Sequence, residues 1–284
     1  MRSDVAVFII THKRADKPLT YNLFKRARYS GKVYLVVDDK DEQLSEYRAK
    51  YKDRVLVFRK DDYKKNVDTH INKFEMNGAI FARNACIDFA QKMKLKYFFV
   101  CDDDLKKIYF KNPTTGKMVT KEASSNIERI FEHMVEYMET ARQIAALAVA
   151  DNGTFFGGIN KTVEAGVKYT LTKMMLYRAE KPIKYESILF EDTATICNGY
   201  RIGKIGFSVM PVSVISQENG TTDGGCKELY EKMSYYVGDF MTLMCRPDAI
   251  RIIQNKSGEL IGNAMQINLY PKIINENYKK ACNE

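Results

Sequence analysis

YFFVCDDDL, residues 97–105, is the stretch that decides the fold. Four apolar residues and Cys101 are followed at once by three carboxylates, Asp102, Asp103 and Asp104. A short apolar run that stops abruptly at charge is typical of a buried parallel strand whose carboxyl end opens into a cleft. Ligands bind at such strand ends, so the stretch predicts both a central strand and a site.

The three adjacent carboxylates repel one another unless a cation or solvent relieves the repulsion. Residues two apart project to the same side of an extended segment, which lets Asp102 and Asp104 share one hard divalent ion. Such an ion typically keeps its remaining positions for water and substrate phosphates. The alternative is a loop that ends the strand with solvated aspartates or caps a following helix.

Upstream of this stretch, apolar runs rich in β-branched and aromatic residues alternate with helical patterns. The expected strands are 5–10, 33–37 and 55–58, and the expected helices begin at Pro18 and cover 44–50 and 77–93. In the last of these helices, an apolar residue recurs every four positions from Phe81 to Met93. The alternation predicts an α/β fold with a doubly wound, parallel sheet.

Two common phosphate-binding signatures of such sheets are missing. Residues 11–14, after the first strand, contain no GxGxxG, and no GxxxxGK followed by Ser or Thr occurs in the chain. Both a dinucleotide-binding Rossmann domain and a P-loop NTPase are therefore disfavoured. A metal-bridged nucleotide diphosphate remains possible, because carboxylates and an ion hold phosphates without a glycine cradle.

Composition sets broader bounds. The 284 residues suffice for one large α/β domain or two small ones, and the net charge of +9 favours an anionic partner such as nucleic acid or a nucleotide. The six cysteines are scattered without CxxC spacing and are expected to be reduced thiols. We find no signal peptide and no apolar run long enough to span a membrane, so a cytoplasmic protein without membrane contact is expected.

The early strand, the Asp38–Asp39 pair after the second strand, the GAIFARNACIDFA helix and YFFVCDDDL together resemble the nucleotide-sugar half of a GT-A glycosyltransferase. The resemblance implies a Rossmann-like GT-A fold in which a DxD motif, here Asp102 and Asp104, holds Mn²⁺ or Mg²⁺ on the diphosphate of a nucleotide-sugar donor, with a UDP-sugar favoured. It further implies that Asp103 contacts ribose or sugar and that Asp38 or Asp39 faces the nucleoside.

Further donor-binding residues are expected around this motif. Thr11, His12 and Arg14 follow the first strand and are candidates for nucleotide contacts. Arg83, in the ARN segment of the helix, is either a bidentate ligand of the diphosphate or a surface arginine. Gly157 and Gly158 follow two aromatic residues and permit close backbone approach to a sugar, although they also suit an ordinary turn.

Glu191 and Asp192 are the second place where carboxylates follow an apolar run. They resemble the acidic pair that opens a helix in inverting GT-A enzymes and supplies the general base toward the acceptor hydroxyl. The alternative is an N-terminal helix cap, which uses the same residues. Many GT-A enzymes take a late histidine as a metal ligand, but this chain has none after His133, so Asp223, water or nothing replaces it.

Between these two acidic sites lies a lysine-rich hairpin with a turn at 112–116. Its lysines are either a solvated face or contacts for the phosphate backbone of an acceptor; they are Lys106, Lys107, Lys111, Lys117 and Lys121. Ser125 with Glu128 then predicts a capping box that opens a helix. Further strands are expected over 169–177 and over 205–215, the latter interrupted at Pro211.

We expect one GT-A domain, with a nucleotide-sugar half over 1–122, an acceptor half over 123–225 and a C-terminal helical extension over 226–284. Among GT-A enzymes, the compact length, the basic charge and the missing membrane segments most resemble phage DNA-modifying enzymes, including the TET-associated glycosyltransferases. That resemblance implies 5-hydroxymethylpyrimidine in phage DNA as the acceptor, in the host cytoplasm. The alternatives are a glycosyltransferase acting on surface saccharide or protein, and a catalytically silent nucleic-acid-binding module.

Overall fold

The structure is a computed structural model of the chain. It describes residues 1–67, 78–112, 114–151, 167–168, 171–188, 190–217, 237–240, 242–244, 247, 250–253 and 264–267.

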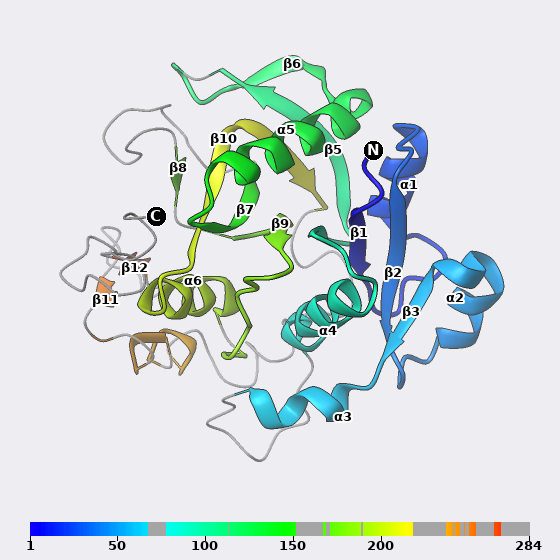
Figure 1. The fold of residues 1–284 in the computed structure, drawn as a ribbon, viewed down its shortest axis with the longest axis horizontal. Coiled ribbons are helices and arrows are strands. Elements are labelled where there is room, and N and C mark those ends of the chain that lie inside the picture. The colour runs from blue at the N-terminus through cyan, green and yellow to red at the C-terminus, as the bar shows by residue number, and fades with distance from the viewer. Residues whose placement is uncertain are drawn as a thin grey trace.

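The N-terminal half alternates strands and helices as the sequence predicts (Figure 1). Its elements are β1 (Val5–Ile10), α1 (Leu19–Arg26), β2 (Lys32–Asp38), α2 (Leu44–Tyr51), β3 (Val55–Phe58), α3 (Lys60–Tyr63), α4 (Ala79–Lys92) and β4 (Tyr97–Asp102), with 3-10 turns at Lys52–Arg54 and Lys64–Asn66. β1 pairs in parallel with β2 and β4, and β2 pairs in parallel with β3.

The second half extends the same sheet. Its elements are β5 (Leu105–Lys111), β6 (Met118–Glu122), a 3-10 turn (Ser124–Asn126), α5 (Ile127–Thr140), β7 (Ile144–Asp151), β8 (Val167–Lys168), β9 (Met174–Arg178), α6 (Glu191–Arg201) and β10 (Ile205–Ser216). The strand order is β3-β2-β1-β4-β9-β7-β10-β5-β6, with β8 on β10. Strands β9, β5 and β8 run against the direction that the others share, so the predicted α/β fold with a mostly parallel sheet is confirmed.

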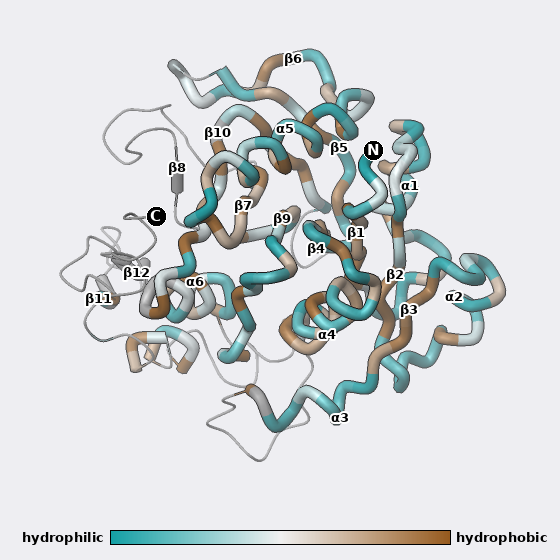
Figure 2. Tube along the Cα trace, in the orientation of Figure 1, coloured by the Kyte–Doolittle hydropathy of each residue, from teal (hydrophilic) through white to brown (hydrophobic). Residues whose placement is uncertain are grey.

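Apolar side chains are buried on both faces of this sheet. In β4, Phe98 and Val100 pack into a core with α4 and α6, while Phe99 and Cys101 pack into a second core with α1, α2 and α5. A strand covered on both faces reads as a continuous apolar run because neither alternating set of side chains meets water. Figure 2 shows these apolar segments along the central strands, with polar residues on the outer helix α3.

β10 pairs with β7 in both its first and its second part. Its second part, from Val212 to Ser216, also pairs with β5 on the other side. The β7 register shifts between Val209 and Ser213, around Pro211, because proline cannot donate to the ladder. The strand therefore returns toward the start of β5, where the Gln217 amide donates to the Asp104 carbonyl at 2.9 Å.

The predicted capping box at Ser125 and Glu128 is wrong. Helix α5 begins after a 3-10 turn, with Asn126 in the capping position and no side-chain cap. The Glu128 carboxylate instead accepts hydrogen bonds from the amide of Ser30 at 3.0 Å and from its hydroxyl at 2.6 Å. The Glu128 side chain therefore bonds to a residue 98 positions away in sequence and does not cap its own helix.

In the predicted C-terminal helical extension, the described residues 237–240 and 242–244 are helical. An antiparallel pair of strands that the sequence did not predict follows, β11 (Ile250–Ile253) and β12 (Ala264–Ile267). Cys86, Cys101 and Cys197 are buried and unbridged, as expected of reduced thiols. Among the described helices, none combines the length and the apolar character that crossing a membrane requires.

Candidate active site

Eight of the predicted site residues lie at the carboxyl ends of β1, β2 and β4: Thr11, His12, Arg14, Asp38, Asp39, Asp102, Asp103 and Asp104. Ile10 is in register with Asp102, and Ile10 with Val36, so the loops after the three strands leave the sheet at the same edge. Asp38 ends β2, and Asp102 ends β4. The parallel part of the sheet therefore brings the DDD segment beside the residues after β1. Ligands of α/β proteins bind at this edge of a parallel sheet.

The three consecutive aspartates have different surroundings. Asp103 points into the loop after β1, where it accepts hydrogen bonds from the Thr11 hydroxyl at 2.7 Å and from the Arg14 guanidinium. Burial raises the pKa of Asp103 to about 6, although the Arg14 charge opposes the shift. Both carboxylate oxygens are occupied within the protein, so Asp103 fixes the β1 loop against β4.

Asp102 and Asp104 are the pair expected to hold a metal. Asp102 accepts a hydrogen bond from Arg83 Nη2 at 3.2 Å, and Lys173 Nζ lies 3.7 Å from Asp104 Oδ2. Asp104 Oδ1 is buried with no hydrogen-bond partner. Burial, and next the charge of Asp102, raise the pKa of Asp104.

A buried carboxylate oxygen without a partner, beside a second carboxylate, fits a hard divalent cation. Within the described part of the chain, no group of three or more His, Cys, Asp or Glu side chains is placed to hold a metal. The pair Asp102 and Asp104 would therefore bind an ion together with water and donor phosphate oxygens, as Mg²⁺ and similar ions bind in other proteins.

Thr20, which the sequence did not single out, fixes the backbone of the DDD segment. Its hydroxyl donates to the Asp102 carbonyl at 2.5 Å and accepts from the Leu105 amide at 2.9 Å. Its own amide donates to the Asp103 carbonyl at 3.1 Å. The first turn of α1 is thus anchored to the acidic segment. Nothing in the local sequence around Thr20 indicates that its hydroxyl bonds to this segment.

Arg83 joins the two acidic segments that the sequence predicts. Its Nη1 donates to Glu191 Oε1 at 2.7 Å, and its Nη2 donates to Asp102, so α4 connects the end of β4 to the start of α6. Burial alone would lower the pKa of this guanidinium, but the charges of Asp102 and Glu191 hold the pKa well above its usual value. The alternative of a surface arginine is wrong, because Arg83 is buried.

The neighbouring Asn84 fixes the backbone of Tyr185, whose ring packs against Arg83. Its amide nitrogen donates to the Tyr185 carbonyl at 2.8 Å, and its amide oxygen accepts from the Tyr185 backbone at 2.9 Å. The Arg83 Cζ atom lies 5.3 Å from the centroid of the Tyr185 ring. The ARN segment therefore fixes an arginine and its aromatic support together.

Glu191 and Asp192 open α6. Glu191 is held by Arg83, whereas burial and the charge of Glu191 raise the pKa of Asp192 to about 6, near the range in which a carboxylate exchanges protons at neutral pH. The two adjacent carboxylates therefore have different surroundings, with Glu191 paired to Arg83 and the pKa of Asp192 raised.

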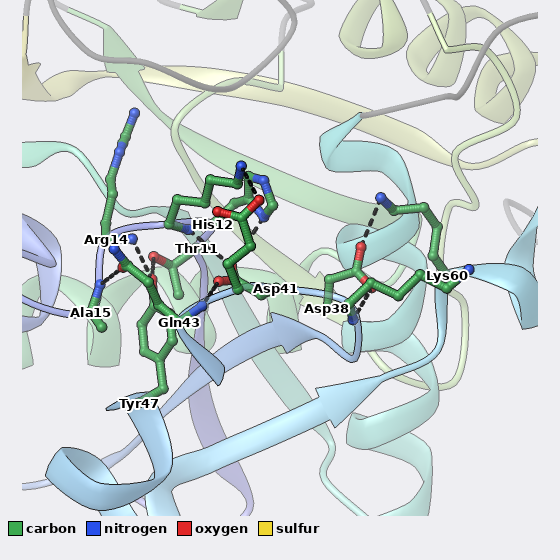
Figure 3. A network of polar contacts seen from close by, with 12 residues as sticks. Thr11, His12, Arg14, Ala15, Asp38, Asp41, Gln43, Tyr47 and Lys60 are labelled. Carbon is green, nitrogen blue, oxygen red and sulfur yellow. Dashed lines mark hydrogen bonds and ion pairs between the residues drawn. The ribbon is translucent and has the colours of Figure 1, made fainter. Parts of the chain in front are cut away.

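At the end of β2, Asp38 is buried and paired with Lys60, whose Nζ lies 2.7 Å from Asp38 Oδ2 (Figure 3). Burial opposes ionisation, yet the Lys60 hydrogen bond holds the pKa of Asp38 below its usual value. Asp39 differs, because burial and the neighbouring Asp38 raise its pKa, and its Oδ1 has no hydrogen-bond partner.

His12 and the loop after β1 are held by residues of the β2–α2 segment (Figure 3). His12 Nδ1 lies 3.0 Å from Asp41 Oδ2, and the Lys13 amide donates to the same oxygen at 2.9 Å. The Tyr47 hydroxyl contacts Thr11 Oγ1 at 2.8 Å and accepts from the Arg14 amide at 2.9 Å. The sequence analysis did not predict Asp41, Tyr47 and Lys60, because their partners lie in other elements. The predicted residues Gly157, Gly158 and Asp223 are outside the described residues.

Asp38→Asn is expected to lower the free energy of unfolding by about 1.5–3 kcal/mol near neutral pH, because it removes a charge-assisted hydrogen bond at a buried site. The folded pKa of Asp38 lies below its ordinary value, so the stabilisation is present above about pH 4 and is lost as the pH falls through the folded pKa. Thermal melts between pH 3 and pH 7 measure the gap between the two proteins. Asp53→Asn, at an exposed position, is the control, and a gap that persists unchanged to pH 3 would contradict the assignment.

A family model described as TET-Associated Glycosyltransferase matches residues 5–225, which include every element from β1 to β10. The chain belongs to the TET-associated glycosyltransferase family. A search of curated proteins with this sequence finds no match. The TET-associated glycosyltransferase match ends at residue 225, and the strands β11 and β12 lie beyond it.

Solved structures give a more distant likeness to this TET-associated glycosyltransferase. Glucosyl-3-phosphoglycerate synthase from Mycobacterium tuberculosis, in complex with Mn²⁺, UDP and glucosyl-3-phosphoglycerate, aligns with a TM-score of 0.46 and 9% identity over 93% of this chain and 86% of that one. GalNAc-T7 with UDP, GalNAc and Mn²⁺ aligns with a TM-score of 0.43 and 13% identity over 84% of this chain and 48% of that one.

Proposed function

We propose that this glycosyltransferase uses a divalent metal to transfer a sugar from a UDP-sugar to a 5-hydroxymethylpyrimidine in phage DNA. The observation that carries the proposal is the carboxylate pair Asp102 and Asp104, in which one buried oxygen has no partner, joined through Arg83 to the acidic start of α6. The arrangement combines a site for a cation and diphosphate with a candidate base, which a nucleic-acid-binding module does not require.

Asp102 and Asp104 would hold Mn²⁺ or Mg²⁺, the hard cations that carboxylates prefer. A bound ion of this kind supplies Lewis-acid stabilisation of the charge that develops on the leaving diphosphate. Arg83 orients the Asp102 carboxylate through its hydrogen bond. Asp103 fixes the loop that carries Thr11, His12 and Arg14 at the nucleotide side of the site.

In the reaction, the acceptor hydroxyl oxygen bonds to the anomeric carbon of the sugar while the bond from that carbon to the diphosphate oxygen breaks. The nucleoside diphosphate leaves with the bonding electrons, and a carboxylate takes the hydroxyl proton. We assign this proton to Asp192, because Glu191 is occupied by Arg83 and the raised pKa of Asp192 suits proton transfer near neutral pH. A single displacement of this kind inverts the anomeric configuration.

Two observations support a DNA acceptor. The family to which the chain belongs is described as TET-associated, and the net charge of +9 favours a polyanionic partner. A base inside a duplex is not accessible to a buried acidic site, so the target nucleotide must be unstacked or flipped. The proposed acceptor places the enzyme with phage DNA in the host cytoplasm.

The function is tested in two steps. Melting temperatures with a panel of nucleotide-sugars, with and without Mn²⁺, should rise for one UDP-sugar only when the metal is present, because binding to the folded state stabilises it. That donor is then incubated with hydroxymethylated DNA, unmodified DNA, and saccharide and protein acceptors, and the products are weighed by mass spectrometry. Sugar addition to hydroxymethylated DNA alone is the expected result, and transfer only to saccharide or protein would overturn the proposed acceptor.

Asp192→Asn is expected to reduce kcat by about 10²–10⁴-fold, the usual contribution of a positioned general base, with little change in donor affinity. Glu191→Gln is the matched control, because it removes the neighbouring charge while leaving Asp192 available. Single-turnover transfer rates and donor titrations measure both effects. Full rate in Asp192→Asn would exclude this residue as the base, and full rate in both variants would favour a retaining mechanism.

A further inference from the structure

The β5–β6 hairpin lies at the end of the sheet, with β6 as the outer strand (Figure 1). β5 begins at Leu105, directly after Asp104, and the turn at its far end is closed by Asn112, whose side chain accepts from the amides of Thr114 and Thr115 at 2.9 and 3.0 Å. At about 3.3 Å per residue, the seven residues of β5 extend about 20 Å from the acidic site. One end of the hairpin is therefore fixed at the proposed site of chemistry.

The exposed surface of this hairpin is basic. Lys106, Lys117 and Lys121 are exposed, and none of the three has an acidic side chain within ion-pair distance among the described residues. Lys107 is exposed too, but its ammonium lies 3.6 Å from Glu122. The guanidinium of Arg26, at the end of α1, donates to the Lys106 carbonyl at 3.0 Å and adds another cation beside the strand.

The same hairpin also exposes apolar side chains. Of the seven large hydrophobic residues that are exposed in the described part of the chain, three lie here: Phe110 is 38% exposed, Met118 36% and Val119 42%. Phe110 and Val119 are adjacent to the Lys111–Met118 pair that joins β5 to β6. Unpaired lysines on an edge strand are expected for solubility alone, but apolar residues between them work against solubility and mark an interaction surface.

We propose that this hairpin, defined by the basic residues Lys106, Lys117 and Lys121 and the apolar residues Phe110 and Val119, is the surface on which duplex DNA docks. Lysines neutralise phosphates, and about 20 Å of duplex presents roughly a dozen of them. Phenylalanine and methionine are side chains that proteins insert between base steps to unstack them. Phe110 is thus the wedge that helps to free the target base.

This inference rests on the proposed DNA acceptor and is tested apart from it. The probe is a fluorescent hydroxymethylated DNA duplex, with binding measured by anisotropy at several salt concentrations. Lys106→Gln/Lys117→Gln/Lys121→Gln is expected to raise Kd about 10- to 100-fold and to reduce the salt slope by about 2–3. Phe110→Ala is expected to raise Kd by about 5-fold or more, the effect of losing one stacking contact, with the salt slope unchanged.

Arg48→Gln/Lys92→Gln/Lys181→Gln, which removes the same charge from α2, α4 and the turn after β9, is the matched control. Donor hydrolysis without acceptor reports an intact donor site in every variant. If wild-type protein binds the duplex and both hairpin variants bind equally well, the hairpin assignment fails while the DNA acceptor stands. If wild-type protein hydrolyses the donor but binds no duplex, the proposed acceptor itself is wrong. Aggregation of the lysine variant at unchanged Kd would show that these lysines only protect an edge strand.

Discussion

Asp104→Asn is expected to reduce the transfer rate by about 10²–10³-fold and, in the same protein, to leave the melting temperature unchanged or higher. The rate falls because the ion and the donor diphosphate lose a charged ligand where charge develops in the transition state. Stability does not fall, because Asp104 Oδ1 is buried without a hydrogen-bond partner, and burial and the charge of Asp102 both disfavour the ionised form of this carboxyl group. Residues that bind a ligand commonly lower the stability of the free protein, so replacing them reduces activity without reducing stability.

The measurement is a set of transfer rates and melting temperatures over a range of Mn²⁺ concentrations. Wild-type protein should be stabilised by the metal and donor together, and Asp104→Asn should not be. Asp61→Asn, which alters an exposed carboxylate of α3, is the control. Full activity of the Asp104→Asn protein would show that the proposed metal site is wrong.

Arg83→Met is expected to destabilise the protein by about 3–5 kcal/mol, because it leaves the carboxylates of Asp102 and Glu191 in a buried region without their shared cation. For a chain of this size, the melting temperature should fall by on the order of 10 °C. Arg83→Lys retains the charge, but a single ammonium group does not reproduce two guanidinium hydrogen bonds, so it should be intermediate.

A double-mutant cycle separates this pairing from general packing. Arg83→Met/Glu191→Gln removes the cation and one of its carboxylates, so the loss of stability should be smaller than the sum of the two single losses by about 1 kcal/mol or more. Chemical denaturation of the four proteins gives the coupling energy. Additive losses would show that Arg83 contributes through its size alone.

The local features of this site are readable in the sequence because each depends on neighbours in the chain. The apolar run before Asp102 marks β4, and the alternation of strand and helix patterns gives the parallel segment β3-β2-β1-β4. Strand burial on both faces leaves a continuous apolar signature. The helix that carries Arg83 follows from its four-residue periodicity.

The pairings between distant segments were not predictable in the same way. Strand β9 inserts between β4 and β7, with Tyr97 in register with Arg178, and no residue in either strand specifies that partner locally. The Arg83–Glu191 contact spans 108 positions. In the same way, Glu128 bonds to the distant Ser30 and not to the N-terminus of its own helix, where the sequence predicts a cap. Long-range contacts decide these positions because they offer buried partners that local patterns do not encode.

The insertion of β9 beside β4 also governs the order in which the enzyme assembles. A chain emerging from the ribosome exposes the edge of β4 until the segment 174–178 has been made, and the Asp102 amide finds its acceptor, the Lys173 carbonyl, only then. Topologies with such distant pairings fold slowly because a long loop must close before the contact is gained. The acidic segment therefore acquires its final shape only after β9 has paired with β4.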